Sequence, residues 1–161
     1  MIEGMAWRFG DNVDTDVIIP GKYLILPAAE AAQHVMAGIR PGFADEVSDG
    51  DVIVGGKNFG TGSSRESAPR AIKDAGIRAI VAQSFARIFF RNCINVGLAP
   101  VECPRATEIA EGQTVRVDVD GGRVEVVDTG LVLDAVPLPE EIGAILKAGG
   151  LEPMLRERFS A

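Results

Sequence analysis

Apolar residues in the central part of the chain fall into short continuous runs separated by stretches with helical spacing. The runs cover residues 52–54, 77–82 and 98–101, and the stretches between them cover residues 66–75 and 85–94. Short apolar runs are typical of buried strands, whereas apolar residues three and four apart are typical of a helix that covers a sheet. A strand, a helix and a strand within about 30 residues form a βαβ unit, so the first two strands should be parallel, with a right-handed crossover.

The C-terminal third of the chain alternates between apolar and polar residues instead. Residues 114–120 and 123–128 alternate strictly, which places the valines of each segment on one face. Asp120, Gly121 and Gly122 lie between the two segments and have the turn chemistry of a β-hairpin. The sequence therefore predicts an antiparallel pair of strands in addition to the parallel unit.

Weaker patterns predict the remaining elements. Residues 4–9 suit an opening strand, residues 131–133 suit a further short strand, and Pro139 opens a last helix. Residues 151–161 carry many charges and few apolar side chains, and we interpret them as a tail. With no linker or internal repeat in the sequence, we predict a single α/β domain, residues 1–161, with a mixed sheet.

Composition and charge exclude several classes of protein. The 161 residues include 16 Lys and Arg against 23 Asp and Glu, a net charge of −7, which argues against nucleic acid and anionic membranes as partners. Two cysteines and one histidine are too few for a disulfide framework, and they predict no metal site on this chain alone. Without a signal-peptide pattern or a membrane-spanning apolar run, the sequence predicts a cytoplasmic protein.

Two segments near the N-terminus each allow a structural and a functional interpretation. Residues 10–16 form a loop with three carboxylates, which are either solvated capping groups or a carboxylate at the rim of an active site. Residues 22–26 are apolar apart from the first and lie between two prolines, as a core strand or as an apolar lip beside a pocket. Residues 28–38 have helical propensity, and His34 within them suits a packing or surface role.

The segment at residues 58–67 is the strongest candidate for a functional site. Its glycines, Gly60 and Gly62, let the backbone adopt positive φ and approach a ligand closely, and Arg65 offers a bidentate fork to a carboxylate. The segment matches neither a nucleotide-binding loop nor the nucleophile turn of a serine hydrolase. Ser63 and Glu66 also have the spacing of a capping box, and that structural interpretation stays open.

A site for a small polycarboxylate is the functional alternative. A serine hydroxyl is a poor base in water, but an oxyanion at Ser63 is favoured in a dry site between a helix N-terminus and a fixed cation. Such a serine could remove a proton next to a carboxylate if another group stabilised the carbanion and took the leaving hydroxide. This chain has no candidate for that second role, so the residues predict half of an active site.

Three ordered motifs, at residues 10–20, 60–66 and 84–92, carry a resemblance to a known family. The chain resembles the small subunits of 3-isopropylmalate dehydratase, and so the swivelling C-terminal domain of aconitases, strongly over residues 1–105. The resemblance implies a single swivelling domain of β/β/α type with a mixed, partly parallel sheet. It also implies a large partner subunit that carries a [4Fe–4S] cluster, with no cofactor on this chain alone.

The resemblance further assigns an activity and roles to residues of this chain. The implied enzyme is a hydro-lyase of leucine biosynthesis that isomerises 2-isopropylmalate and 3-isopropylmalate by dehydration and rehydration. Ser63 matches the serine that takes and returns the proton, and Ser64 and Arg65 match residues around the substrate carboxylate. Asp16 matches an active-site carboxylate that pairs with a histidine of the larger part.

Substrate choice is expected to depend on residues 23–26, namely Tyr23, Leu24, Ile25 and Leu26. Homoaconitate-type members often carry arginine at the position of Ile25, and an apolar lip suits an isopropyl group instead. Thr61 and Ser67 depart from the residues common in the family, which leaves a homoaconitase or a 2,3-dimethylmalate dehydratase as alternatives. A non-catalytic module for a small anion is the alternative from another class, and the isolated chain is open to homo-oligomer formation.

Overall fold

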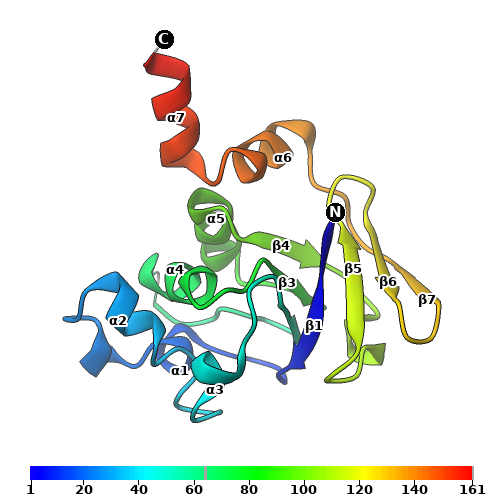
Figure 1. The fold of residues 1–161 in the computed structure, drawn as a ribbon, viewed down its shortest axis with the longest axis horizontal. Helices are drawn as coiled ribbons and strands as arrows, with labels where there is room; N and C mark the ends of the chain where they lie inside the picture. Colours follow the sequence, from blue (N-terminus) through cyan, green and yellow to red (C-terminus); the bar gives the residue numbers. More distant parts are fainter. Residues whose placement is uncertain (64, 161) are drawn as a thin grey trace.

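A mixed sheet positions the candidate site in the computed structural model, which describes residues 1–63 and 65–160. In this described part the sheet has seven strands in the order β4-β3-β2-β1-β5-β6-β7 (Figure 1). The strands are β1 (Ile2–Arg8), β2 (Val52–Gly55), β3 (Ala79–Ala82), β4 (Ala99–Glu102), β5 (Thr114–Asp118), β6 (Arg123–Val126) and β7 (Leu131–Asp134). The predicted mixed α/β sheet is confirmed.

The sheet changes from parallel to antiparallel at β1. Strands β1 to β4 are parallel to their neighbours, with Ile53 opposite Ile80 in the register of β2 and β3. On its other side β1 pairs antiparallel with β5, and the predicted hairpin of β5 and β6 follows. All residues of β2 and β3 are buried, as expected for parallel strands covered on both faces.

Helices and short turns connect the strands. They are α1 (Thr15–Ile18), η1 (Gly21–Tyr23), α2 (Ala28–Ala32), α3 (Phe43–Glu46), α4 (Ser67–Asp74), α5 (Arg87–Val96), η2 (Ala106–Glu108), α6 (Glu140–Lys147) and α7 (Leu151–Phe159). Figure 1 shows α4 and α5 beside the parallel strands, and α7 extending away from the body of the molecule. Among the residues described, no helix has the length and apolarity that a membrane crossing requires.

Two apolar clusters lie on the two faces of the parallel strands. Ile53 and Ile80 belong to a cluster with the residues of α4 and α5 that face the sheet, including Ile72 and Phe89. The neighbouring residues of the same strands join a second cluster with the valines of β5 and β6. This alternation gives layers of helix, parallel strands and antiparallel hairpin. The prediction that residues 1–161 form one domain stays a prediction, which the continuous sheet supports.

The capping-box interpretation of Ser63 and Glu66 is wrong. Helix α4 begins at Ser67 with Glu66 as its N-cap residue and no side-chain cap, so Ser63 lies outside the helix and forms no capping box. The Ser63 carbonyl instead accepts hydrogen bonds from the Arg65 N–H and from the Thr15 hydroxyl. Helix α5 likewise has no side-chain cap, and the Ser84 hydroxyl that precedes it accepts the Asn58 N–H.

Three element predictions also need correction. The helix predicted at 28–38 ends at Ala32, and Met36 adopts a left-handed conformation in which its N–H bonds to the Ile18 carbonyl. Residues 22–26 form no strand, since they contain the end of η1 and a turn with Leu24 and Ile25 exposed. The predicted C-terminal tail contains a helix, α7. The sequence did not predict this helix because the segment has few apolar side chains.

A buried carboxylate fixes the start of the sheet. Asp51 is 5% exposed and accepts hydrogen bonds from the Met5 and Ser48 N–H groups and from the Trp7 indole N–H, at 2.9–3.1 Å. Since Met5 and Trp7 belong to β1 and Asp51 precedes β2, this carboxylate ties the two parallel strands together.

Replacing Asp51 should destabilise the protein strongly. Asp51→Asn leaves buried N–H donors opposite an amide NH₂, and we expect a loss of about 2–3 kcal/mol in the free energy of unfolding. Urea denaturation followed by the fluorescence of Trp7 measures this loss. Asp49→Asn is the control, because Asp49 forms an exposed ion pair with Arg78 and should cost less than about 1 kcal/mol. Equal losses in the two variants would contradict the assigned role of Asp51.

Candidate active site

The central turn at residues 59–63 lies between two other loops. On one side, the Gly60 N–H bonds to the Val13 carbonyl at 2.7 Å, and the Thr15 N–H bonds to the Thr61 carbonyl at 2.8 Å. On the other side, the Phe59 N–H donates to the Ser84 carbonyl at 3.0 Å, and the Ala86 N–H donates to the Phe59 carbonyl at 3.0 Å. These bonds continue the parallel pairing beyond the carboxyl ends of β2 and β3, where open α/β sheets bind ligands.

Gly60 is required at its position by a close approach to α5. A Cβ atom on Gly60 would lie 2.0 Å from Cγ of Phe89, and the backbone there has a φ of 87°. Gly62, with a φ of 100°, then turns the chain so that the Thr15 hydroxyl reaches the Ser63 carbonyl at 2.9 Å. Both glycines adopt the positive φ that the sequence predicts, and the close approach at Gly60 is to Phe89, a contact that the sequence did not predict.

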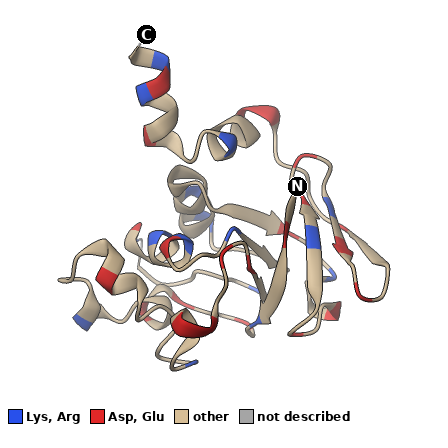
Figure 2. Cartoon of the chain, in the orientation of Figure 1, with Lys and Arg blue, Asp and Glu red and all other residues tan. Residues whose placement is uncertain are grey.

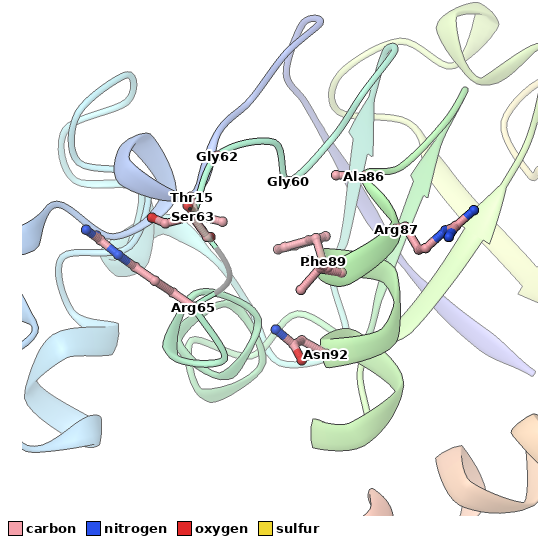
Figure 3. A pocket seen from close by; sticks show the side chains of 10 residues that line it. Thr15, Gly60, Gly62, Ser63, Arg65, Ala86, Arg87, Phe89 and Asn92 are labelled. Carbon is pink, nitrogen blue, oxygen red and sulfur yellow. Dashed lines mark hydrogen bonds between the residues drawn. The ribbon is translucent and has the colours of Figure 1, made fainter.

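Ser63 lies at the wall of a pocket of about 260 Å³. The pocket has the central turn and Thr15 on one side and the first turns of α5, with Phe89 and Asn92, on the other (Figure 3). Figure 3 also shows the Arg65 side chain directed away from Phe89 and Asn92. Asn92 belongs to a motif noted in the sequence, but its place in the pocket could not be read from the spacing.

Asp16 and Arg65 are brought together by this arrangement of loops. Nη1 of Arg65 lies 2.9 Å from Oδ1 of Asp16 and 3.5 Å from the Ile19 carbonyl. The Arg65 side chain is 28% exposed and that of Asp16 is 64% exposed, so water competes for both charges. An ion pair this open contributes about 1 kcal/mol or less, and an incoming carboxylate can replace Asp16 on the guanidinium.

The expected substrate lip lies on the other side of Arg65. Ile25 is 89% exposed, and Leu24 and Leu26 line a small pocket with Ile19 that reaches the start of α4. Tyr23 does not point outward with them, because its ring stacks on His34 with centroids 4.0 Å apart. The single histidine thus has the packing role predicted for it, and it anchors the segment that carries the lip.

Ser64 lies outside the described residues. Cys93 and Cys103 are both free and fully buried, and burial raises the pKa of each thiol, that of Cys93 well above its ordinary value. Within residues 1–63 and 65–160, no group of three His, Cys, Asp or Glu side chains is arranged to hold a metal ion.

The fold and the matched motifs define the chain as a domain of the aconitase C-terminal class. Residues 41–106 match the family described as the aconitase C-terminal domain. The crystal structure of a 3-isopropylmalate dehydratase from Methanocaldococcus jannaschii superposes with a TM-score of 0.92 and 47% identity, covering 98% of this chain and 94% of that chain.

Relatives of known name define the family more closely. The isopropylmalate/citramalate isomerase small subunit of M. jannaschii is 49% identical, over 99% of this chain and 96% of its own length. The 3-isopropylmalate dehydratase small subunit of Halothermothrix orenii is 51% identical, over 93% of this chain and 92% of its own length. The chain belongs to the family of 3-isopropylmalate dehydratase small subunits, and it is thus one subunit of a hydro-lyase.

Substituting Gly60 should disturb the turn that holds Ser63. Gly60→Ala places a methyl group against the Phe89 ring in a backbone conformation that alanine disfavours, and we expect a loss of about 2–4 kcal/mol in stability. Thermal denaturation measures the effect. Gly21→Ala is the control, since no heavy atom lies within 4 Å of the added Cβ, and its effect should stay within about 0.5 kcal/mol. An unchanged melting temperature for Gly60→Ala would show that the turn moves freely away from Phe89.

Proposed function

We propose that the chain is the small subunit of an enzyme that interconverts 2-isopropylmalate and 3-isopropylmalate in leucine biosynthesis. The observation that carries the proposal is that Ser63 and Arg65 line one pocket and Arg65 pairs with Asp16, in a chain similar to such subunits over nearly its full length. The reaction removes water from one carbon and returns it to the neighbouring carbon. A cytoplasmic location, in keeping with that pathway, stays a prediction.

In this proposal Ser63 moves the proton. Its oxygen takes the proton from the carbon next to a substrate carboxylate, the hydroxide leaves from the neighbouring carbon, and the proton returns when water adds back. The hydrogen bond from Thr15 to the Ser63 carbonyl and the turn at Gly62 hold the serine in place for this transfer. The cation of Arg65, which lines the same pocket as Ser63, favours the oxyanion that a serine base requires.

Arg65 binds a substrate carboxylate in the proposed complex. Its guanidinium is already oriented by Asp16 and the Ile19 carbonyl, so little conformational entropy is lost when the substrate arrives. Asp16 is then free to turn toward the partner subunit, which matches its implied role beside a histidine there. Ser64, by its match to the family motif, is proposed to contribute to the same carboxylate site.

The second half of the site belongs to the large partner subunit. The buried cysteines of this chain do not fit a cluster ligand role, because both thiols lie inside the apolar cores and their pKa values are raised. A [4Fe–4S] cluster on the partner would supply the Lewis acid toward the substrate hydroxyl. We therefore expect no activity from this chain alone.

The apolar lip favours an aliphatic substituent on the substrate. Leu24, Ile25 and Leu26 offer no charge to a third carboxylate, and Arg70, a cation that lines the same pocket, already pairs with Glu66 at 3.8 Å. Citramalate is the second candidate substrate, because it carries a small apolar group and a relative bears its name. Homocitrate-type substrates and 2,3-dimethylmalate are the other substrates to compare in the same activity assay.

Replacing Ser63 tests the proposal. With the cluster-bearing partner subunit added, Ser63→Ala should lower kcat on 2-isopropylmalate by about 10²–10⁴-fold and leave KM within a few-fold. The melting temperature should hold, because the Ser63 side chain is exposed and caps no helix. Ser48→Ala, an exposed serine far along the chain from the turn, should keep wild-type turnover. Ser63→Ala turnover within a few-fold of wild type would reject Ser63 as the base.

Replacing Ile25 tests the basis of substrate choice. Ile25→Arg places a cation on the lip, so kcat/KM should fall for 2-isopropylmalate and rise for a homologous tricarboxylate by about tenfold or more. Competition between the two substrates in one assay measures the ratio directly. Ile39→Arg is the matched control, because Ile39 is also exposed but lies outside the lip. If the ratio of the two kcat/KM values changes equally in both variants, the lip does not determine substrate choice.

A further inference from the structure

We propose that the angle between α6 and α7 is an interface through which two copies of this chain pair about a two-fold axis. The inference does not depend on the reaction proposed above. It rests on the exposed apolar side chains of α7, the local charge balance around them and the place of this surface in the fold.

Helix α7 is an exposed helix with an apolar stripe. None of its nine residues is buried, and Leu151, Leu155 and Phe159, four residues apart, are 37%, 42% and 78% exposed. A helix of nine residues is marginal in water unless an amphipathic face packs against something. The groove beside it has a volume of about 530 Å³ and is lined mainly by aliphatic side chains of α6 and α7, including Ile145 and Met154.

The start of α7 is fixed, so the exposed stripe is presented at a defined angle. Gly150 begins the helix with a φ of 128°, and a Cβ there would lie 2.6 Å from the Asn95 carbonyl oxygen. The Lys73 ammonium joins the same region by donating to the Val96 and Gly149 carbonyls at 2.7 and 3.0 Å. Figure 1 shows the result, with α7 leaving α6 at an angle and extending away from the sheet.

The charges around this groove suit a second copy of the same surface. The chain has a net charge of −7, but α7 carries Glu152 and Glu157 against Arg156 and Arg158, so the helix is neutral (Figure 2). Two copies can therefore approach along α7 without the repulsion that the rest of the chain would impose. A strongly basic partner would instead favour an acidic surface.

The rim of the groove is self-complementary. Glu140 and Glu141 at the start of α6 line it on one arm, and Arg158 near the end of α7 lines it on the other. An isologous contact places each surface patch against the same patch of the other copy. With α7 of each copy in the angle of the other, Arg158 meets Glu140 and Glu141 across the interface.

The position of this surface leaves the candidate active site accessible. Helix α5 begins at Arg87, which lines the Ser63 pocket, and ends at Val96. The Lys73 ammonium joins this end of α5 to the junction of α6 and α7, because it donates to the carbonyls of both Val96 and Gly149. Ten helical residues span about 15 Å, so the pocket and the groove lie at opposite ends of α5. Pairing of two copies and closure of the site by a cluster-bearing subunit are therefore compatible.

Sedimentation of the purified full chain tests the pairing. The wild type should sediment as a dimer at micromolar concentrations, and Leu155→Glu should weaken the dimer by about 30-fold or more, because it places a charge at the centre of the contact. Val132→Glu is the matched control, since Val132 on β7 is similarly exposed and its replacement should leave the dimer unchanged. Circular dichroism verifies that each variant is folded.

A charge exchange separates the second copy from other partners. Arg158→Glu should weaken the dimer, and adding Glu141→Arg to it should restore pairing, because the two charges exchange places across a two-fold axis. The proposal is overturned if the wild type remains a monomer at millimolar concentration. It is also overturned if Leu155→Glu leaves the dimer intact and only weakens binding of the cluster-bearing subunit, which would assign the groove to that subunit.

Discussion

The parallel backbone pairing of three segments beyond the sheet is the constraint on which the candidate site depends. Residues 13–15, 59–61 and 84–86 follow different elements of the chain, yet hydrogen bonds join them side by side. Gly60 permits this pairing, since Phe89 leaves no space for a Cβ at that position. Ser63, Asp16 and Arg65 take their relative positions from this backbone scaffold, and their own side-chain interactions, such as the open Asp16–Arg65 ion pair, contribute little stability.

The parts of the fold that the sequence predicted correctly are those with a local pattern in the sequence. The apolar runs around Ile53 and Ile80 are strands whose two faces are both buried. A continuous apolar run is typical of such a strand, so the sequence pattern alone indicates it. The hairpin of β5 and β6 was predicted from alternating valines and a glycine turn, which are local signals. Glycines at 60 and 62 were predicted to take positive φ, and they do.

The predictions that failed depended on competition between local and tertiary interactions. Ser63 has the spacing of a capping residue, but the Thr15 hydroxyl, 48 residues away, binds its carbonyl and the helix begins at Ser67 instead. Residues 28–38 have helical propensity, but the tertiary bond from Met36 to Ile18 ends the helix early. The contact of Phe89 with Gly60 and the ion pair of Asp16 with Arg65 likewise join residues that no local pattern connects.

The proposed division of labour between subunits agrees with where this chain places its polar groups. Asp16 is exposed and Arg65 is partly exposed, whereas the two thiols are buried in the apolar cores. An exposed serine and an ion pair that water reaches lack the dry surroundings that would favour a serine oxyanion. In the proposed function, closure against the partner subunit would supply those surroundings, whereas the hydrogen bonds that hold the turn lie within this chain. The position of the turn is therefore set by this chain, and the dry environment is what the proposal assigns to the partner.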